Sequence, residues 1–592
     1  MRKEKLDGRE FFNLFSYGAN EVILNREKLN KINVFPVADG DTGNNLVSTL
    51  NSILDYTQVN DSFSETLNSM SEASLYGARG NSGVIFAQYI SGLASQTKGK
   101  AYVKLKDFAT ASMESAHGLY SALSNPVEGT MLTVIKEWSA YISENHSKYE
   151  FFDEMFESSI EIASKSLDET KEKLEVLKKN NVVDSGGKGF VLFLEGVIKY
   201  LKGYSIENIK QTVSVGQSLE VKSHISEEES YYRYCTECII KGNVPSQELI
   251  KEELNNLGDS IIVAGNENFK HIHIHTNEVE DFFSEVSKYG VISRPKVEDI
   301  HLQEKLKVSK GKIAVVTDSI ADIPKDILEK HDIHQIPLNI LVGDNVYLDK
   351  TTIKSEDFYN IINNSPIYPN SSQPNDIDIK NKIDFLKDHY ESIVIISVSS
   401  KLSGTYDSLV KYSNVLKKSG YPIEVIDSRL NSVAQGLLVV EIAQMVEQGK
   451  NIEDILKSAQ EIIPKTEIYV ALDTFKNSLK SGRVPKIIGK IGVFFKLRPI
   501  ISLNKEGKGA AFSIAISKKT LMKKILDLVK SKNGEQKIFK YAVVHSGDEK
   551  NANIFAKQVE EILGLKPEYI CEISSITALH AGEKAVAIGF IR

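Results

Sequence analysis

The chain has 592 residues, of which 41% are hydrophobic and 26% charged, and its formal net charge is −7. This length exceeds what one hydrophobic core usually organises, so we expect three or four domains. The acidic balance gives no reason to expect nucleic acid as a partner. The sequence contains no run of about 18 apolar residues, so we expect no membrane-spanning helix. Three cysteines and an N-terminus without an apolar signal core favour a location in the reducing cytoplasm.

Residues 1–202 carry apolar side chains at three- and four-residue spacing, which predicts an all-α helical domain. The spacing runs through Phe11–Leu29, Leu46–Tyr56, Val84–Leu93 and Met131–Ile142. The loops between these segments are rich in Asp, Asn, Ser and Gly. A bundle that carries its polar chemistry in the loops is the simplest architecture.

The rest of the chain predicts two further domains. Residues 203–310 begin with a polar, acidic linker and continue with short β-like runs, which predicts a small α+β domain. From 311 to 592, strand-like runs such as IAVVTDS and SIVIISVSS alternate with helical segments. This alternation predicts a single α/β domain or a two-lobed α/β module, with mainly parallel strands.

The sharpest chemical signal is the segment NVFPVADGDTGNN at residues 33–45. Asp39 and Asp41 stand one residue apart in a glycine-rich turn, where they can converge on a hard divalent cation. Asn45 follows at the predicted start of a helix, where free N–H groups favour phosphate. A turn that merely caps the helix explains this segment, taken alone, equally well.

Three more loops of similar composition follow in the same domain: ARGNSG at 78–83, EGTML at 128–132 and VDSGGKG at 183–189. Four such loops in one helical domain are hard to explain by packing alone. The GGKG run lacks the spacing of a P-loop, so we do not interpret it as a Walker A motif.

These four motifs, in this order, resemble the nucleotide-binding domain of the dihydroxyacetone kinase family, and most closely the branch found in fatty acid kinases. The resemblance covers residues 8–202 and implies an eight-helix barrel that binds ATP and Mg²⁺. Asn33 stands where the dihydroxyacetone branch has a third metal-binding aspartate. The implied site consists of the Mg²⁺ ligands Asp39 and Asp41, the nucleotide contacts Asn45, Ser82, Gly83 and Thr130, and Asp184 at the pocket rim.

A second metal signal is the run HIHIH at residues 271–275. Its alternation places three imidazoles on one face of a β-strand. The segment Tyr234–Cys238 can bring a thiolate across from a neighbouring strand, and one Cys with two His residues is a reasonable Zn²⁺ set. Alternatively, these are exposed histidines on an edge strand that bind nothing.

The runs YCTE, LGDSIIVAG and HIHT resemble the middle domain of fatty acid kinases. That resemblance implies a Zn²⁺ ion held by Cys235, His273 and His275. Cys238 is then a core residue, and His271 lies outside the family motif.

In the last 280 residues, hydroxyl groups gather where predicted strands end, as in VVTDS, SSQP, SSKLSGTY and VIDS. Loops beyond strand C-termini are where α/β sheets bind ligands. The alternative is that Ser, Thr and Asp only cap the helices that follow. No G-x-S-x-G elbow is present, so we expect no nucleophilic serine.

These runs, with SGRV and HAGEKAVAIGF, resemble the DegV family of fatty-acid-binding proteins over residues 311–592. The resemblance implies an apolar tunnel for an acyl chain whose carboxylate meets hydroxyl groups. The residues it assigns to substrate are Ser371, Ser403 and Gly404. Arg483 and His580 match charged positions near the carboxyl group that serve phosphoryl transfer.

Together the resemblances imply a fatty acid kinase with its nucleotide-binding and lipid-binding modules in one chain. The expected reaction converts ATP and a long-chain fatty acid to ADP and an acyl phosphate for lipid synthesis. We expect a cytoplasmic homodimer that contacts membrane surfaces only transiently. The alternatives are a dihydroxyacetone-type kinase, a non-catalytic lipid-binding protein and a regulatory scaffold.

Overall fold

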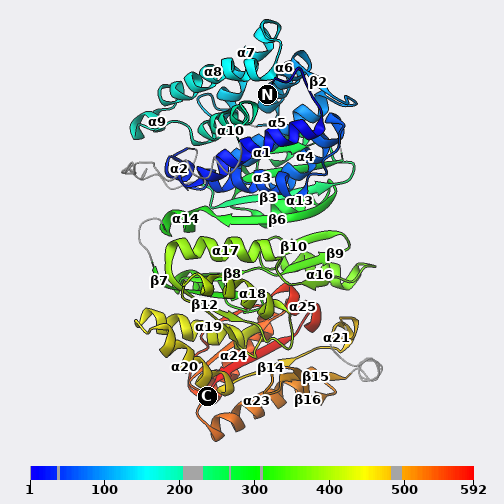
Figure 1. The fold of residues 1–592 in the computed structure, drawn as a ribbon. Coiled ribbons are helices and arrows are strands. Elements are labelled where there is room, and N and C mark those ends of the chain that lie inside the picture. Colours follow the sequence, from blue (N-terminus) through cyan, green and yellow to red (C-terminus); the bar gives the residue numbers. More distant parts are fainter. Residues whose placement is uncertain are drawn as a thin grey trace. The chain divides into compact units, whose positions relative to one another are not determined.

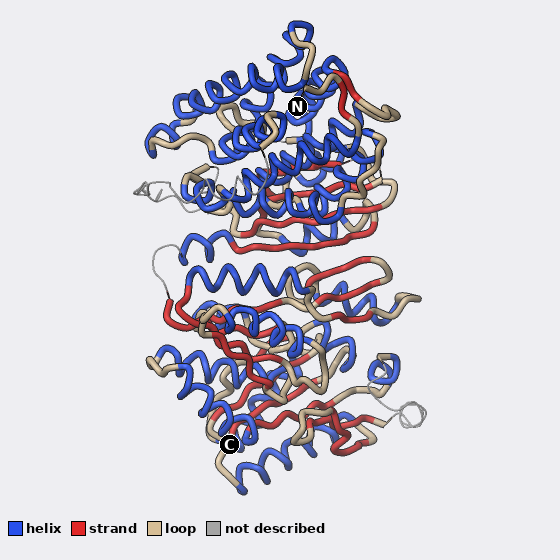
Figure 2. The backbone as a smooth tube through the Cα atoms, viewed as in Figure 1, coloured by secondary structure: helices blue, strands red, loops and turns tan. Residues whose placement is uncertain are grey.

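The computed structural model describes residues 2–35, 40–123, 125–204, 231–265, 268–306, 311–481 and 497–592. The chain forms two compact units, Met1–Lys305 and Leu306–Arg592 (Figures 1 and 2). The predicted boundary at 310/311 lies close to this division, whereas the first two predicted domains fall within one unit. In the parts of the chain that the structure describes, no helix combines the length and apolarity needed to cross a membrane.

The first part of unit 1 is helical, as predicted. Its core includes the fully buried Phe15, Trp138 and Phe190. Helices α1 and α10 approach closely at two glycines, since a Cβ on Gly196 would lie 2.4 Å from the Tyr17 carbonyl oxygen. The helices are α1 (Gly8–Leu24), α2 (Arg26–Lys31), α3 (Thr42–Tyr56), α4 (Phe63–Gly77), α5 (Gly80–Gln96), α6 (Leu105–Ala122), α7 (Met131–Asn145), α8 (Phe152–Lys173), α9 (Glu175–Asn180) and α10 (Ser185–Leu201).

Three details of this helical part differ from the sequence predictions. The predicted helix Phe11–Leu29 breaks at Asn25, whose side-chain amide donates to the Glu21 carbonyl and ends α1. Strands β1 (Lys5–Leu6) and β2 (Val103–Lys104) form a small antiparallel sheet in a domain predicted to be all-α. The described residues of this domain contain ten α-helices, two of them only six residues long, where the resemblance implied eight.

The second part of unit 1 is a four-stranded antiparallel sheet with the strand order β4-β5-β3-β6. Leu75, Val84 and Ala87 of the helical part pack against Ile262 and Ala264 of this sheet, so the two parts share a core. This shared core explains why they form one unit. The elements are β3 (Tyr234–Lys241), α12 (Gln247–Leu254), β4 (Gly258–Gly265), β5 (Phe269–Thr276), α13 (Val279–Val286), β6 (Val291–Asp299) and α14 (Ile300–Leu306).

Unit 2 begins with a parallel sheet in the strand order β13-β12-β7-β8, as the strand–helix alternation predicts. A small antiparallel sheet, β10-β9-β11, lies in the same lobe. The elements of this lobe are β7 (Gly311–Asp318), α15 (Lys325–Lys330), β8 (Ile333–Ile336), β9 (Asn339–Val342), β10 (Asn345–Leu348), α16 (Ser355–Asn364), β11 (Asn370–Ser372), α17 (Asp376–His389), β12 (Tyr390–Ser397), α18 (Thr405–Lys418) and β13 (Ile423–Asp427).

The second lobe contains the six-stranded sheet β16-β15-β14-β19-β17-β18, in which only β17 and β18 are parallel neighbours among the described strands. The prediction of mainly parallel strands is therefore wrong for this lobe. The last strand, β19, inserts between β14 and β17 and runs opposite to both. The elements are α19 (Ser432–Glu447), α20 (Ile452–Ile462), β14 (Thr466–Ala471), α21 (Lys476–Lys480), β15 (Arg498–Leu503), β16 (Gly509–Ala515), α23 (Lys518–Glu535), β17 (Lys540–His545), α24 (Glu549–Leu563), β18 (Ile570–Glu572), α25 (Ser575–Ala581) and β19 (Val586–Ile591).

Helix α19 joins the two lobes. It is buried along most of its length, as its nearly continuous apolar sequence indicates, and it contacts strands of both large sheets, including β7 and β19. A helix buried on all sides is typical of the centre of a layered domain.

Candidate functional site

The start of α3 is set by asparagine side chains. The Asn33 amide oxygen accepts hydrogen bonds from the Thr42 N–H, at 3.2 Å, and from the Thr42 hydroxyl. The helix begins at Thr42, earlier than predicted, and the Asn45 N–H donates to the Asp41 carbonyl at 2.9 Å. Asn45 therefore offers its side-chain amide, not a free backbone N–H, and Asp39 lies outside the described residues.

The start of α5 lies directly against this segment. Gly80, at the first position of α5, has φ +52°, and a Cβ there would lie 2.3 Å from the Asn45 side-chain nitrogen. A Cβ on Gly83 would lie 2.6 Å from the Thr49 hydroxyl oxygen, so this glycine permits the close packing of α3 on α5. The small residues of this motif therefore serve packing and also hold Asn45 against α5.

A first pocket brings the helical loops and the middle sheet together. It is lined by Asp41, Asn45 and Ser82 from the helices. Cys235, His273 and His275 of the sheet line the same pocket. Part of the expected nucleotide and Mg²⁺ site thus faces the same cavity as the expected zinc site.

A second pocket adjoins the first, since Phe35, Asn81 and Ser82 line both. Thr130 and Asp184 line this second pocket, with Asp259 of β4 on the sheet side. The Thr130 hydroxyl donates to the Val127 carbonyl at 2.8 Å.

Asp184 caps α10, and its carboxylate accepts a hydrogen bond from the Gly187 N–H at 2.7 Å. Burial raises the pKa of Asp184 to about 6, although hydrogen bonds from the N–H groups of Gly187 and Met131 oppose the shift. A carboxyl group with this pKa is partly protonated near pH 6, so its charge at the pocket rim changes just below neutral pH.

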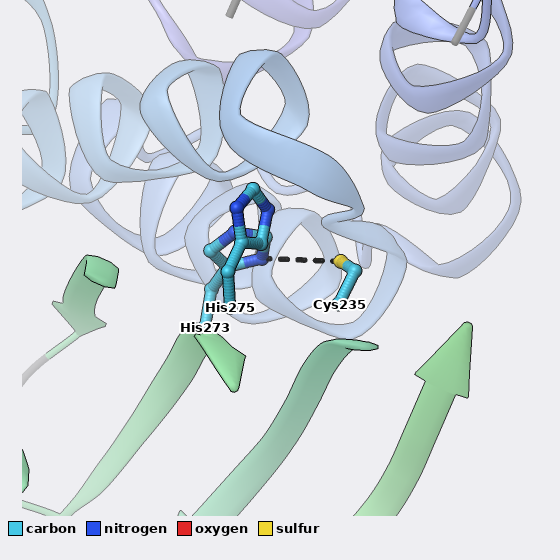
Figure 3. Close-up of side chains that lie close together, drawn as sticks. All are labelled: Cys235, His273 and His275. Carbon is cyan, nitrogen blue, oxygen red and sulfur yellow. Dashed lines mark hydrogen bonds between the residues drawn. The ribbon is translucent and has the colours of Figure 1, made fainter. Parts of the chain in front are cut away.

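Cys235, His273 and His275 converge in the first pocket (Figure 3). Cys235 on β3 pairs in register with His275 on β5, and its Sγ lies 3.8 Å from His273 Nδ1. One possible ligand atom from each of the three residues lies within 4.8 Å of the others. The histidines are buried, and β5 is an interior strand, so the alternative of exposed histidines on an edge strand is wrong.

The chemistry of this trio fits zinc. The His273 Nε2 atom is buried and has no hydrogen-bond partner among the described residues. Burial lowers the pKa of His275 to about 3, which keeps the imidazole neutral, as metal ligation requires. Burial raises the pKa of the Cys235 thiol, so its deprotonation would accompany metal binding. Cys238 is fully buried, as expected of a core residue.

Glu237 is a site residue that sequence reasoning missed. Its carboxylate accepts a hydrogen bond from the Gly80 N–H at 2.8 Å and lies 3.0 Å from His273 Nδ1. Burial favours the neutral acid, but the charge of Lys296 and the contact with His273 hold the pKa of Glu237 well below its usual range. The sequence does contain a signal for this residue: in the strand-like run TECII, the Glu237 carboxylate is followed by three apolar residues.

In unit 2, the expected substrate residues lie in two adjacent segments. Ser371 is in β11, and Ser403 and Gly404 precede α18. A Cβ on Gly404 would lie 2.5 Å from the Gln373 side-chain oxygen, which shows that the end of β11 approaches the loop before α18. The Ser403 hydroxyl lies 2.8 Å from the Thr405 hydroxyl.

Other hydroxyl and carboxyl groups at the strand ends have structural roles. The Thr317 hydroxyl donates to the Ile396 carbonyl, and the Ser319 hydroxyl donates to Asp349. Asp318 is fully buried and accepts hydrogen bonds from the Val398 N–H and the Ser397 hydroxyl. These residues hold neighbouring strands and loops together, but they do not cap the helix that follows, α15, whose N-cap residue is Pro324.

His580 lies at the end of α25, and its carbonyl accepts a hydrogen bond from the Ser478 hydroxyl of α21 at 2.8 Å. The Tyr368 hydroxyl donates to the Leu579 carbonyl and accepts from the Asn477 amide, which further ties α21 to α25. Arg483 follows α21 in the sequence but lies outside the described residues.

Family models match most of the chain in three consecutive regions. Residues 36–199 match the DAK2 domain, and residues 231–307 match the FakA-like middle domain of fatty acid kinase. Residues 312–592 match the DegV family of uncharacterised proteins.

Similar proteins include an uncharacterized protein from Staphylococcus epidermidis, 32% identical over 52% of this chain and 57% of the relative. An uncharacterized protein from Staphylococcus aureus USA300 is 32% identical over 52% of this chain and 58% of the relative. The aligned region thus covers less than two thirds of these relatives.

Similar solved structures include a stearic acid-binding protein from Eubacterium ventriosum, with 25% identity over 48% of this chain and 98% of that one, and a TM-score of 0.44. DegV, a fatty acid binding protein from Bacillus subtilis, has 25% identity over 48% of this chain and 100% of that one, and a TM-score of 0.43. The three family regions show that this chain joins a DAK2 domain, a FakA-like middle domain and a DegV domain, an arrangement that matches a fatty acid kinase architecture.

Proposed function

We propose that this protein is a fatty acid kinase that converts ATP and a bound long-chain fatty acid to ADP and an acyl phosphate for lipid synthesis. One observation carries the proposal: a DAK2 domain, whose motifs line two adjoining pockets, occurs in the same chain as a DegV domain. The motifs of residues 311–592, which resemble those of fatty-acid-binding DegV proteins, favour a lipid as the acceptor.

The reaction needs little covalent chemistry from the protein. A fatty acid carboxylate is already ionised at pH 7, because the reference pKa of a carboxyl group is about 4. One carboxylate oxygen bonds to the γ-phosphorus while the bond from that phosphorus to the β–γ bridging oxygen breaks, and ADP leaves with that electron pair. No general base is required, so catalysis depends on positioning and on charge neutralisation.

In this proposal, Asn45, Ser82, Gly83 and Thr130 bind the nucleotide and Asp184 completes the pocket. Asp39 and Asp41 would hold Mg²⁺, and Cys235, His273 and His275 would hold Zn²⁺. When bound, these cations add positive charge beside the phosphates.

On the acceptor side, burial of the acyl tail holds the lipid, since each methylene removed from water contributes about 0.8 kcal/mol. Ser371 and Ser403 donate hydrogen bonds to the carboxylate, and the exposed Gly404 leaves room beside it. Arg483 and His580 reduce the repulsion between the carboxylate and the γ-phosphate.

An acyl phosphate reacts with hydroxylamine to give a hydroxamate, which provides a direct test. The purified chain, incubated with ATP, Mg²⁺ and a long-chain fatty acid, should form hydroxamate with no second protein added. Arg483→Ala should reduce the rate at least tenfold while lipid still co-purifies, and Lys505→Ala, at an exposed turn, should not change it. No product from wild-type protein that binds both ATP and lipid would refute the proposal and favour a non-catalytic lipid-binding protein.

A further inference from the structure

We propose that Glu237 is a positioning residue that couples metal binding at Cys235, His273 and His275 to nucleotide binding at the start of α5. The inference rests on the proposed function and adds a regulatory link within its site.

The carboxylate of Glu237 connects the two parts of unit 1. Its side chain is only 3% exposed, and a single oxygen, Oε1, contacts both the Gly80 N–H of the helical part and His273 Nδ1 of the sheet. The other oxygen, Oε2, lies 3.8 Å from Lys296 Nζ and 4.0 Å from His271 Nε2. A movement of either Gly80 or His273 therefore changes a contact of the same atom.

On the metal side, Glu237 determines which nitrogen of His273 carries the proton. A carboxylate that accepts from Nδ1–H leaves the lone pair on Nε2, which is buried without a partner among the described residues, so in this inference the metal binds Nε2 and the Nδ1 atom near Cys235 Sγ is not a ligand. Carboxylate partners of this kind orient metal-binding histidines, and their loss typically weakens metal binding 10- to 100-fold.

On the nucleotide side, Glu237 caps the N-terminus of α5, because no side chain at the N-cap position of this helix does so. Arg79, at the N-cap position, makes no side-chain capping hydrogen bond. Glu237 satisfies the first N–H of the helix and places a negative charge at its positive end, which stabilises the helix start. Asn81 and Ser82 follow within the same turn and line both pockets.

Because one carboxylate serves both sites, the occupancy of one site should change the affinity of the other. A metal ion on His273 fixes Glu237, and Glu237 fixes the helix start that faces the nucleotide. Thermodynamic linkage requires the effect to be reciprocal: zinc must change ATP affinity by the factor by which ATP changes zinc affinity.

The test measures two affinities on the full chain. Zinc affinity is measured by competition with a chromophoric chelator, and affinity for Mg·ATP is measured by calorimetry with and without zinc. For wild type we expect removal of zinc to weaken ATP binding at least fivefold, and ATP to strengthen zinc binding by the same factor. In Glu237→Gln, zinc affinity should fall 10- to 100-fold and the coupling factor should approach one. Glu248→Gln, at an exposed position of α12, controls for the loss of one charge.

Independent binding of zinc and Mg·ATP by the wild-type chain would overturn this inference without any variant, so a folding defect in Glu237→Gln cannot hide the answer. Such a result would leave the proposed function intact, because that function depends on acyl phosphate formation. Failure of the hydroxylamine assay with coupled binding still present would refute only the proposed function.

Discussion

Replacing Gly80 with alanine tests whether the start of α5 holds Asn45 for the nucleotide. Gly80 has φ +52°, a conformation that costs a non-glycine residue about 1–2 kcal/mol. The new Cβ would lie 2.3 Å from the Asn45 side-chain nitrogen, well inside van der Waals contact, so the Asn45 amide must move. Both effects act on the helix start that lines the pocket.

The expected loss follows from the contact that Asn45 would make with a phosphate. A hydrogen bond to a charged group contributes about 1.5–3 kcal/mol, and its loss would raise the Kd for Mg·ATP roughly 10- to 100-fold. The strained backbone should also lower the free energy of unfolding by about 1–3 kcal/mol.

Calorimetric titration with Mg·ATP, together with thermal unfolding, separates the two effects. Gly118→Ala is the matched control, because Gly118 lies within α6 and no atom stands within 4 Å of its added Cβ. That control should keep wild-type ATP affinity and equal or greater stability, since alanine favours a helix interior by about 1 kcal/mol. In protein that already carries Asn45→Ala, the additional change Gly80→Ala should weaken the binding of Mg·ATP only slightly further. Wild-type ATP affinity in Gly80→Ala would refute the assignment of Asn45 to the nucleotide.

Three further changes probe the same part of unit 1. Asp41→Ala should abolish Mg²⁺-dependent ATP turnover with an unchanged circular dichroism spectrum; turnover at the wild-type rate would show that the acidic loop is only a turn. Asp184 has a folded-state pKa of about 6, raised from 3.8 by burial, so the stability that its protonation contributes is present below pH 3.8 and is lost as the pH rises through 6. The stability difference between wild type and Asp184→Asn should therefore change by about 3 kcal/mol between pH 7 and pH 3, and a difference independent of pH would contradict this. Purified protein should contain about one zinc ion per chain by mass spectrometry, and Cys235→Ser/His273→Ala should contain none; a metal content unaffected by the double substitution would place zinc elsewhere.

The features that could be predicted from sequence are those with a local cause. The helical periodicity of residues 1–202 reflects which face of each helix is buried. The alternation of HIHIH places the three imidazoles on one face of β5, but both faces of this strand are buried. The sequence also indicates that the segment Tyr234–Cys238 can lie beside the histidine strand, but the register that pairs Cys235 with His275 comes from the structure. In the helices, the burial seen in the structure agrees with the periodicity.

The features that could not be predicted depend on long-range pairing. Strand β19 runs antiparallel between β14 and β17, and its apolar sequence VAIGFI contains no information about direction. Glu237 looks like an ordinary polar residue in a strand, and its role arises only because Gly80 lies 157 positions earlier in the chain and packs against it. Convergence of this kind is visible only after folding.

The polar loops of unit 2 separate into two groups according to how their hydrogen bonds are satisfied. Thr317, Asp318 and Ser319 are fully buried and bond to neighbouring strands and loops, so a ligand would have to displace internal hydrogen bonds to reach them. Ser371 and Ser403 are only partly buried. The Ser403 hydroxyl accepts from the Thr405 N–H at 3.3 Å and pairs with the Thr405 hydroxyl, which uses part of its hydrogen-bonding capacity and leaves one site for a ligand. A carboxylate that binds in this lobe would therefore meet the end of β11 and the loop before α18, and not the end of β7. Burial and internal hydrogen bonding thus distinguish the segment VVTDS from the two segments that the DegV resemblance assigns to the substrate, although all of them look alike in sequence.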